Sequence, residues 1–230
     1  MKKYYKYELS IGIVTLISFV LLIPFIFVIP LLFNNIDVDD KFFISFILFY
    51  ILYFLYMALH ELIHGIGYFL SGTKKENITY GMALEKGICY CLTKTPINKK
   101  GILFSITLPF ITIGVITLII SIIFKLPMLG LLSIFNISGC SGDLVMFFFF
   151  LNKEKDIMYK EIDDPTKFVI ISNNELKSTK WLGLKLLESG DYAEDKFKTT
   201  DHKRVVISTF SKIFMIISLI ICILMLGFYL

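Results

Sequence analysis

Residues 54–72 read FLYMALHELIHGIGYFLSG, an apolar run that one short polar group interrupts. That group is His60, Glu61 and His64, in the pattern H-E-x-x-H. On a helix of about 3.6 residues per turn, positions i and i+4 lie on one face, so both imidazole rings can reach one point. Polar side chains inside an apolar segment are costly unless a partner compensates for them. The stretch therefore predicts a helix that carries a functional polar site.

A metal ion is the partner that fits these residue types. Two histidines one turn apart on a helix bind Zn²⁺, and the intervening glutamate can act as a general base toward water. We therefore predict His60 and His64 as zinc ligands and Glu61 as the catalytic base. The alternative is a polar network between helices that is satisfied without a metal.

The composition of the whole chain explains the apolar setting of this motif. Of 230 residues, 56% are hydrophobic and 18% are charged, and the mean hydropathy is +0.76. A soluble domain is usually about half apolar. Five segments reach the length of about 20 apolar residues that a transmembrane helix needs. The predicted spans cover about residues 9–33, 42–70, 102–124, 128–151 and 205–230.

These spans predict an all-α membrane protein, a bundle of about five transmembrane helices. Residues 1–151 would form the membrane bundle with the metal site, and residues 205–230 the fifth helix. A small cytosolic β-hairpin is expected within residues 73–100, where two β-prone runs flank the turn EKG. Residues 152–204 are expected to form a cytosolic segment, β-prone at first and helical around residues 181–187.

Loop charges orient the predicted bundle. Lysine-rich loops alternate with lysine-poor loops, so the positive-inside rule predicts a multi-pass protein of the cell membrane with its N-terminus cytosolic and its C-terminus outside. The net charge of +4 is too mild to suggest nucleic-acid binding. The expected partners are therefore the lipid bilayer and a membrane protein or peptide substrate, with no nucleic acid. The scarcity of Arg beside abundant Lys and Ile is typical of an AT-rich bacterial genome.

A third ligand is needed, because a catalytic zinc site has three protein ligands and one open position. Asp143, in FNISGCSGDLVMFF, is the acid in the predicted spans that remains after Glu61 is assigned. Both Asp143 and the middle of the motif lie about eight residues before the cytosolic ends of their spans. At a rise of about 1.5 Å per residue, both lie ~12 Å deep. We therefore predict Asp143 as the third ligand; the alternative is a buried aspartate paired with lysine or water.

Asn136 lies seven residues before Asp143, about two helical turns along the same face. It is a candidate substrate-binding residue, because its amide can bond a carbonyl near the scissile bond; it can equally bridge two helices. The small residues 138–142 allow helices to approach closely. They equally allow a substrate backbone to approach the metal, and the sequence leaves both readings open.

The pairing of HELIH in one span with NISGCSGD in a later one resembles the site-2 protease type of intramembrane metalloprotease. The closer resemblance is to the putative zincin peptidase family of small multi-pass bacterial membrane proteins. There a hairpin, a Pro-containing span and a small-residue-plus-Asp span follow the motif in the same order. Pro109 and EIDDPTKFVIIS fit that order, and the resemblance covers about residues 45–171. Gly142 precedes Asp143, whereas site-2 proteases have glycine after the aspartate.

The resemblance implies hydrolysis of peptide bonds within the membrane. We therefore predict a zinc-dependent intramembrane endopeptidase that acts on membrane-embedded or membrane-adjacent substrates near the cytosolic face. The hairpin would then be a candidate edge for strand addition by the substrate. Two alternatives stay open: a surface-acting metalloprotease with Glu76 or Glu85 as third ligand, and a non-catalytic membrane metal-binding or sensor protein.

Overall fold

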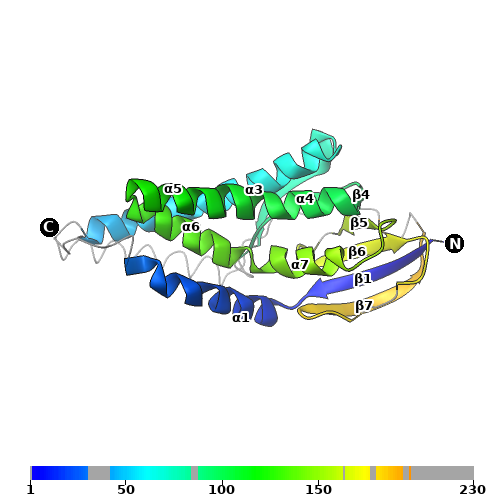
Figure 1. The fold of residues 1–230 in the computed structure, drawn as a ribbon. Coiled ribbons are helices and arrows are strands. Elements are labelled where there is room, and N and C mark those ends of the chain that lie inside the picture. The colour runs from blue at the N-terminus through cyan, green and yellow to red at the C-terminus, as the bar shows by residue number, and fades with distance from the viewer. Residues whose placement is uncertain are drawn as a thin grey trace.

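The structure is a computed structural model that describes residues 2–30, 42–83, 88–162, 164–176, 180–193 and 197. Helices run alongside one another, and a β-sheet lies at one end of them (Figure 1). The strands are β1 (Lys3–Leu9), β2 (Ile78–Ala83), β3 (Ile88–Thr93), β4 (Ile97–Asn98), β5 (Met158–Glu161), β6 (Lys167–Ser172) and β7 (Leu184–Asp191). The helices are α1 (Ile11–Leu22), α3 (Phe42–Leu70), α4 (Lys99–Pro109), α5 (Thr117–Phe124), α6 (Pro127–Gly139) and α7 (Ser141–Leu151). A π-helical segment, Phe110–Ile116, joins α4 to α5.

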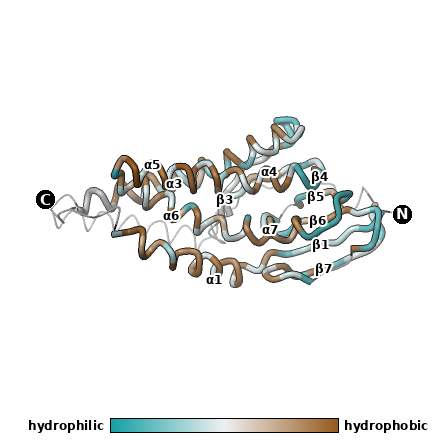
Figure 2. Tube along the Cα trace, in the orientation of Figure 1, coloured by the Kyte–Doolittle hydropathy of each residue, from teal (hydrophilic) through white to brown (hydrophobic). Residues whose placement is uncertain are grey.

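Two of the described helices are long and apolar enough to cross a membrane, namely Ile47–Leu70 within α3 and the continuous helix Lys99–Phe124. The pair α6 and α7 is bent by 46°, and it adds a third such span if the two count as one. A shorter apolar helix covers Ile11–Phe27. Hydrophobic residues follow the helices, whereas the sheet end is more hydrophilic (Figure 2). The predicted fifth span, residues 205–230, lies outside the described residues.

A five-stranded antiparallel sheet shows that the all-α prediction was wrong. Its strand order is β4-β5-β6-β1-β7. The segment expected to be helical around residues 181–187 instead leads into strand β7. The N-terminal strand β1 pairs on both sides, so that Lys3 lies opposite Ser172 on β6 and Asp191 on β7. The described fold is therefore mixed α/β.

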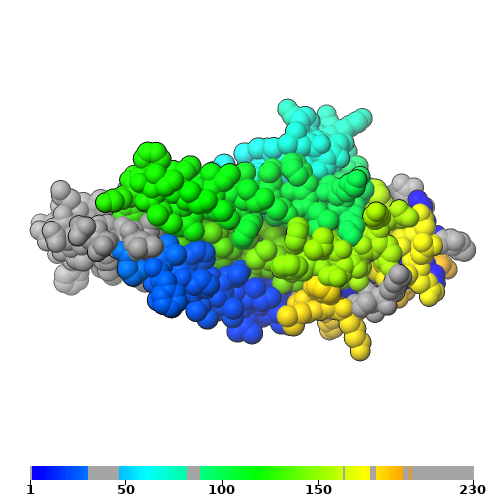
Figure 3. Space-filling view, viewed as in Figure 1, coloured from blue at the N-terminus to red at the C-terminus, as the bar shows by residue number. Residues whose placement is uncertain are grey.

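The core of the molecule joins this sheet to α7. Tyr7 of β1 is fully buried, and its ring centroid lies 5.1 Å from that of Phe149 on α7 and 5.6 Å from that of Phe168 on β6. Aromatic pairs at these separations add to the stabilisation that burial gives. This contact fixes the position of α7 against the sheet. The chain of α6 and α7 runs between α1 on one side and α4–α5 on the other (Figure 3).

Strands β2 and β3 form a separate two-stranded antiparallel sheet that packs on α3. A Cβ at Gly65 of α3 would lie 1.8 Å from the Tyr80 hydroxyl of β2, so the Tyr80 side chain lies directly over Gly65. The hairpin is thereby held beside the helix that carries the H-E-x-x-H motif.

The bend between α6 and α7 lies at Cys140, among small residues. Gly139 and Gly142 flank it, and glycine is about 1 kcal/mol less favourable than alanine within a helix. Because the chain restarts as a new helix at Ser141, Asp143 lies in the first turn of α7. A carboxylate is favoured there by the helix dipole. From this first turn the Asp143 carboxylate reaches the two histidines of α3.

Candidate metal centre

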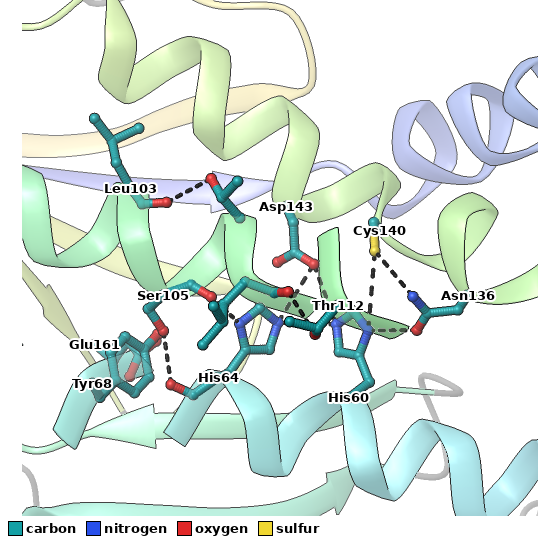
Figure 4. Close-up of polar contacts among 12 residues, drawn as sticks. His60, His64, Tyr68, Leu103, Ser105, Thr112, Asn136, Cys140, Asp143 and Glu161 are labelled. Carbon is teal, nitrogen blue, oxygen red and sulfur yellow. Dashed lines mark hydrogen bonds and ion pairs between the residues drawn. The ribbon is translucent and has the colours of Figure 1, made fainter. Parts of the chain in front are cut away.

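The two histidines of α3 converge with Asp143 of α7 (Figure 4). The Nε2 atoms of His60 and His64 lie 2.9 Å apart. Oδ2 of Asp143 lies 3.3 Å from Nε2 of His60 and 3.4 Å from Nε2 of His64. Three potential ligand atoms from two helices therefore surround one point.

These separations fit a zinc ion. Zinc bonds of about 2.0–2.1 Å in a tetrahedron place ligand atoms about 3.3–3.4 Å apart. The two distances to Asp143 match that value, and the distance between the histidines is shorter by about 0.4 Å. Two imidazole nitrogens and one carboxylate oxygen are also a donor set that catalytic zinc uses. The residues present thus fit zinc in both chemistry and spacing.

The opposite nitrogen of each histidine ring is held by an acceptor. Nδ1 of His60 lies 2.8 Å from Oδ1 of Asn136, and Nδ1 of His64 lies 3.0 Å from the backbone oxygen of Ser105. A carbonyl oxygen only accepts, so each Nδ1 carries the hydrogen and each Nε2 keeps its lone pair free. Such partners orient metal-binding histidines and fix their tautomer. The structure therefore places Asn136 against a histidine.

Glu61 lies next to the same point. One of its carboxylate oxygens is within 4.8 Å of the ligand atoms of His60 and His64. The backbone N–H of Cys91 on β3 donates a hydrogen bond to this carboxylate. The hairpin therefore helps to hold Glu61 in place, a role that the sequence did not indicate.

A cavity of about 420 Å³ opens onto these residues. Its walls come from α1, α3, β3 and the two halves of the bent pair α6–α7. The side chain of Asp143 is 18% exposed, against 8% for His64, so the carboxylate side of the centre faces the open space. A ligand of several atoms can reach the centre from this cavity.

A third carboxylate, that of the buried residue Glu161 on β5, lines the same cavity as Glu61 and Asp143. It accepts hydrogen bonds from the hydroxyls of Tyr68 (3.0 Å) and Tyr159 (2.7 Å) and from the backbone N–H of Thr93. Burial raises the pKa of Glu161 to about 7, although these three donors act in the opposite direction. The sequence gives no sign of this role for Glu161, because an acid in the run EIDD looks like a solvated residue.

A further group of possible ligands shares His60 and Asp143 with the set His60, His64 and Asp143. It consists of His60, Cys140 and Asp143. However, Sγ of Cys140 lies 4.0 Å from Nδ1 of His60, the nitrogen that faces Asn136. Cys140 is thus on the far side of the ring from His64, and we favour the set with two histidines.

The alternative third ligands are not at the centre. Glu76 lies in a short exposed turn before β2 and belongs to neither group of possible metal ligands among the described residues. Glu85 lies outside the described residues. The structure therefore brings Asp143, and not Glu76, to the two histidines.

Zinc hydrolases use centres of this kind. Two histidines lie one turn apart on a helix, a glutamate is their neighbour, and a carboxylate comes from a second helix. Comparison with known families agrees: residues 53–158 match the family described as "Putative zincin peptidase". The match includes the motif and Asp143. It suggests a metallopeptidase, and the zincin description implies zinc. No curated protein and no solved structure matches the chain.

Proposed function

We propose that this protein is a zinc-dependent endopeptidase that cleaves membrane-embedded or membrane-adjacent polypeptides. The observation that carries the proposal is the convergence of His60, His64 and Asp143 on one point beside Glu61, at the wall of an open cavity. Two or three described helices that can cross a membrane support its membrane setting. A cytosolic N-terminus and an external C-terminus remain predictions from the loop charges.

Each residue then has a distinct task. His60, His64 and Asp143 would hold the zinc ion. A bound zinc ion would lower the pKa of a water molecule toward about 7 and polarise the scissile carbonyl. Glu61 would take the proton of the attacking water on its carboxylate and pass it to the leaving amine. Asn136 would position His60 by accepting its Nδ1–H. A contact of Asn136 with substrate remains a prediction from the sequence.

Strand β3, which forms part of the cavity wall, limits where a substrate could bind by strand addition. In an antiparallel pair, the backbone N–H groups of alternate residues point toward the partner strand and away from it. The Lys94 N–H donates to the backbone oxygen of Asn77, the residue before β2, so the N–H groups of Cys89, Cys91 and Thr93 point away from β2. The N–H groups of Cys91 and Thr93 already donate to Glu61 and Glu161. Strand addition would therefore have to begin near Cys89, and the cavity itself is the more accessible place for a peptide.

The substitution Glu61→Gln tests the proposal. Purified wild-type and variant proteins in detergent, each loaded with zinc, would be incubated with a peptide library made from membrane proteins, and new termini would be mapped by mass spectrometry. We expect both proteins to bind one zinc ion and only the wild type to cleave. Cleavage by the variant at wild-type rates would refute the role of Glu61. Zinc binding without cleavage by either protein would refute the peptidase and favour the metal-binding or sensor alternative.

Asp143→Ala and Glu76→Ala form a matched pair that tests the ligand set. Zinc content should fall strongly for Asp143→Ala and stay at the wild-type level for Glu76→Ala. The reverse result would favour the surface-acting metalloprotease. Metal analysis after dialysis against a weak chelator gives both values in one experiment.

A further inference from the structure

Ser105 of α4 makes two contacts with His64 of α3. Its backbone oxygen accepts the Nδ1–H of the ring at 3.0 Å, and its hydroxyl donates to the backbone oxygen of His64 at 2.8 Å. Both residues are buried. The orientation of this histidine therefore depends on one backbone carbonyl of a neighbouring helix.

In an intact α-helix that carbonyl would already have a partner. The backbone oxygen of residue i accepts the N–H of residue i+4, which for Ser105 is residue 109. Residue 109 is proline, and proline has no N–H. Its ring also clashes with the carbonyl of residue i−4 and tilts it away from the helix axis. Pro109 thus frees the Ser105 oxygen from the helix of α4.

The approach of the two helices brings the freed oxygen within reach. A Cβ at Gly67, on α3, would lie 2.6 Å from Cα of Ser105, so the two helices touch where Gly67 has no side chain. In consequence the carbonyl of Ser105 meets the imidazole of His64 directly. Figure 4 shows this oxygen beside the ring, on the side away from Asp143.

We propose that Pro109 is a positioning residue for His64: by releasing the Ser105 carbonyl it fixes the ring with its hydrogen on Nδ1 and its Nε2 lone pair toward Asp143. The inference rests on the proposed role of His64 as a zinc ligand. The two histidines are then oriented in different ways. His60 uses the side chain of Asn136, whereas His64 uses a backbone group that a proline lying four residues further along α4 makes available.

The test is Pro109→Ala, which returns an N–H to compete for the Ser105 oxygen. The matched control is Pro127→Ala, because Pro127 lies at the first turn of α6, where its missing N–H interrupts no helical bond. Two quantities would be measured in the purified full-length proteins. The first is the zinc Kd, by competition with a chromogenic chelator. The second is the tautomer of His64 without zinc, by NMR of ¹⁵N-histidine-labelled protein, which has only three histidines to assign.

We expect wild type and Pro127→Ala to have His64 protonated on Nδ1 and to bind zinc equally well. Pro109→Ala should show a mixture of His64 tautomers and a zinc Kd about 10-fold higher or more, as for other residues that orient metal ligands. An unchanged tautomer and Kd in Pro109→Ala would overturn the inference. So would wild-type protein with the His64 hydrogen on Nε2, a result that needs no variant to fold.

The outcome separates this inference from the proposed function. If the wild type binds no zinc, the metal centre fails, while the His64 tautomer without zinc still decides whether Pro109 positions the ring. If the wild type binds zinc and Pro109→Ala behaves like it in both measurements, only the role of Pro109 fails.

Discussion

Substitution of Gly67 by alanine should disturb the centre without touching a proposed ligand. The new Cβ would lie 2.6 Å from Cα of Ser105, whereas ordinary contacts begin at 3.4 Å. Because the obstructing atom belongs to the backbone of α4, the two helices must separate by at least about 0.8 Å. The hydrogen bond from Nδ1 of His64 to Ser105, now 3.0 Å, would lengthen to about 3.8 Å, beyond the usual limit of about 3.2 Å.

Two magnitudes follow for Gly67→Ala. Overpacking of a close contact costs about 1–3 kcal/mol of stability. Loss of the partner that orients a metal ligand lowers metal affinity about 10- to 100-fold. Thermal unfolding in detergent measures the first, and zinc competition with a chelator measures the second.

Gly12→Ala in α1 is the matched control for Gly67→Ala. A Cβ at Gly12 has nothing within 4 Å, and Gly12 does not line the cavity. This variant should keep wild-type zinc affinity and gain up to about 1 kcal/mol from helix propensity. If Gly67→Ala folded and bound zinc as tightly as the wild type, the link between helix contact and ligand orientation would be wrong.

Three further predictions use other parts of the structure. The Tyr7 hydroxyl is buried without a hydrogen-bond partner among the described residues, so Tyr7→Phe should keep or raise stability, by about 1 kcal/mol, in thermal unfolding; a loss of more than that would reveal a hidden partner. The pKa of Glu161 is raised from 4.5 to about 7, so wild-type stability should fall as pH rises from about 4.5 through 7. Glu161→Gln should lack this part of the pH dependence, and equal slopes would contradict the assignment. Asn136→Ala should raise the zinc Kd about 10- to 100-fold, while Asn136→Asp, which keeps an acceptor for His60, should largely restore it.

The residues of the candidate centre could be predicted from the sequence for two reasons: the histidines lie close together along the chain, and an acid is unusual in an apolar segment. The spacing of His60 and His64 places them on one face of any helix. Asp143 stands out as an acid in an apolar run, and its distance from the end of its predicted span places it at the same depth as the motif. The residues that hydrogen-bond to these side chains were harder to predict from the sequence. Pro109 gave a signal, a proline inside an apolar helix, but the contact between Ser105 and His64 depends on how two helices pack.

The sheet could not be predicted because its pairing is between distant parts of the chain. The run KYYKYEL is short and rich in lysine, and by itself it looks like a charged flank of the first apolar helix. The strands that pair with it, β6 and β7, lie more than 150 residues further along the chain. Residues 181–187 have leucines at helical spacing, yet the tertiary context makes Leu184–Asp191 an edge strand of the same sheet.

The order of synthesis separates β1 from its neighbours in time. Lys3 pairs with Asp191, which leaves the ribosome about 190 residues later, a delay of roughly ten to forty seconds at about 5–20 residues per second. In that interval α3, α4 and α7 are all translated. The nascent chain thus presents an unpaired tyrosine-rich strand for most of its translation. The helices around His60 and His64 can assemble before that strand finds either neighbour.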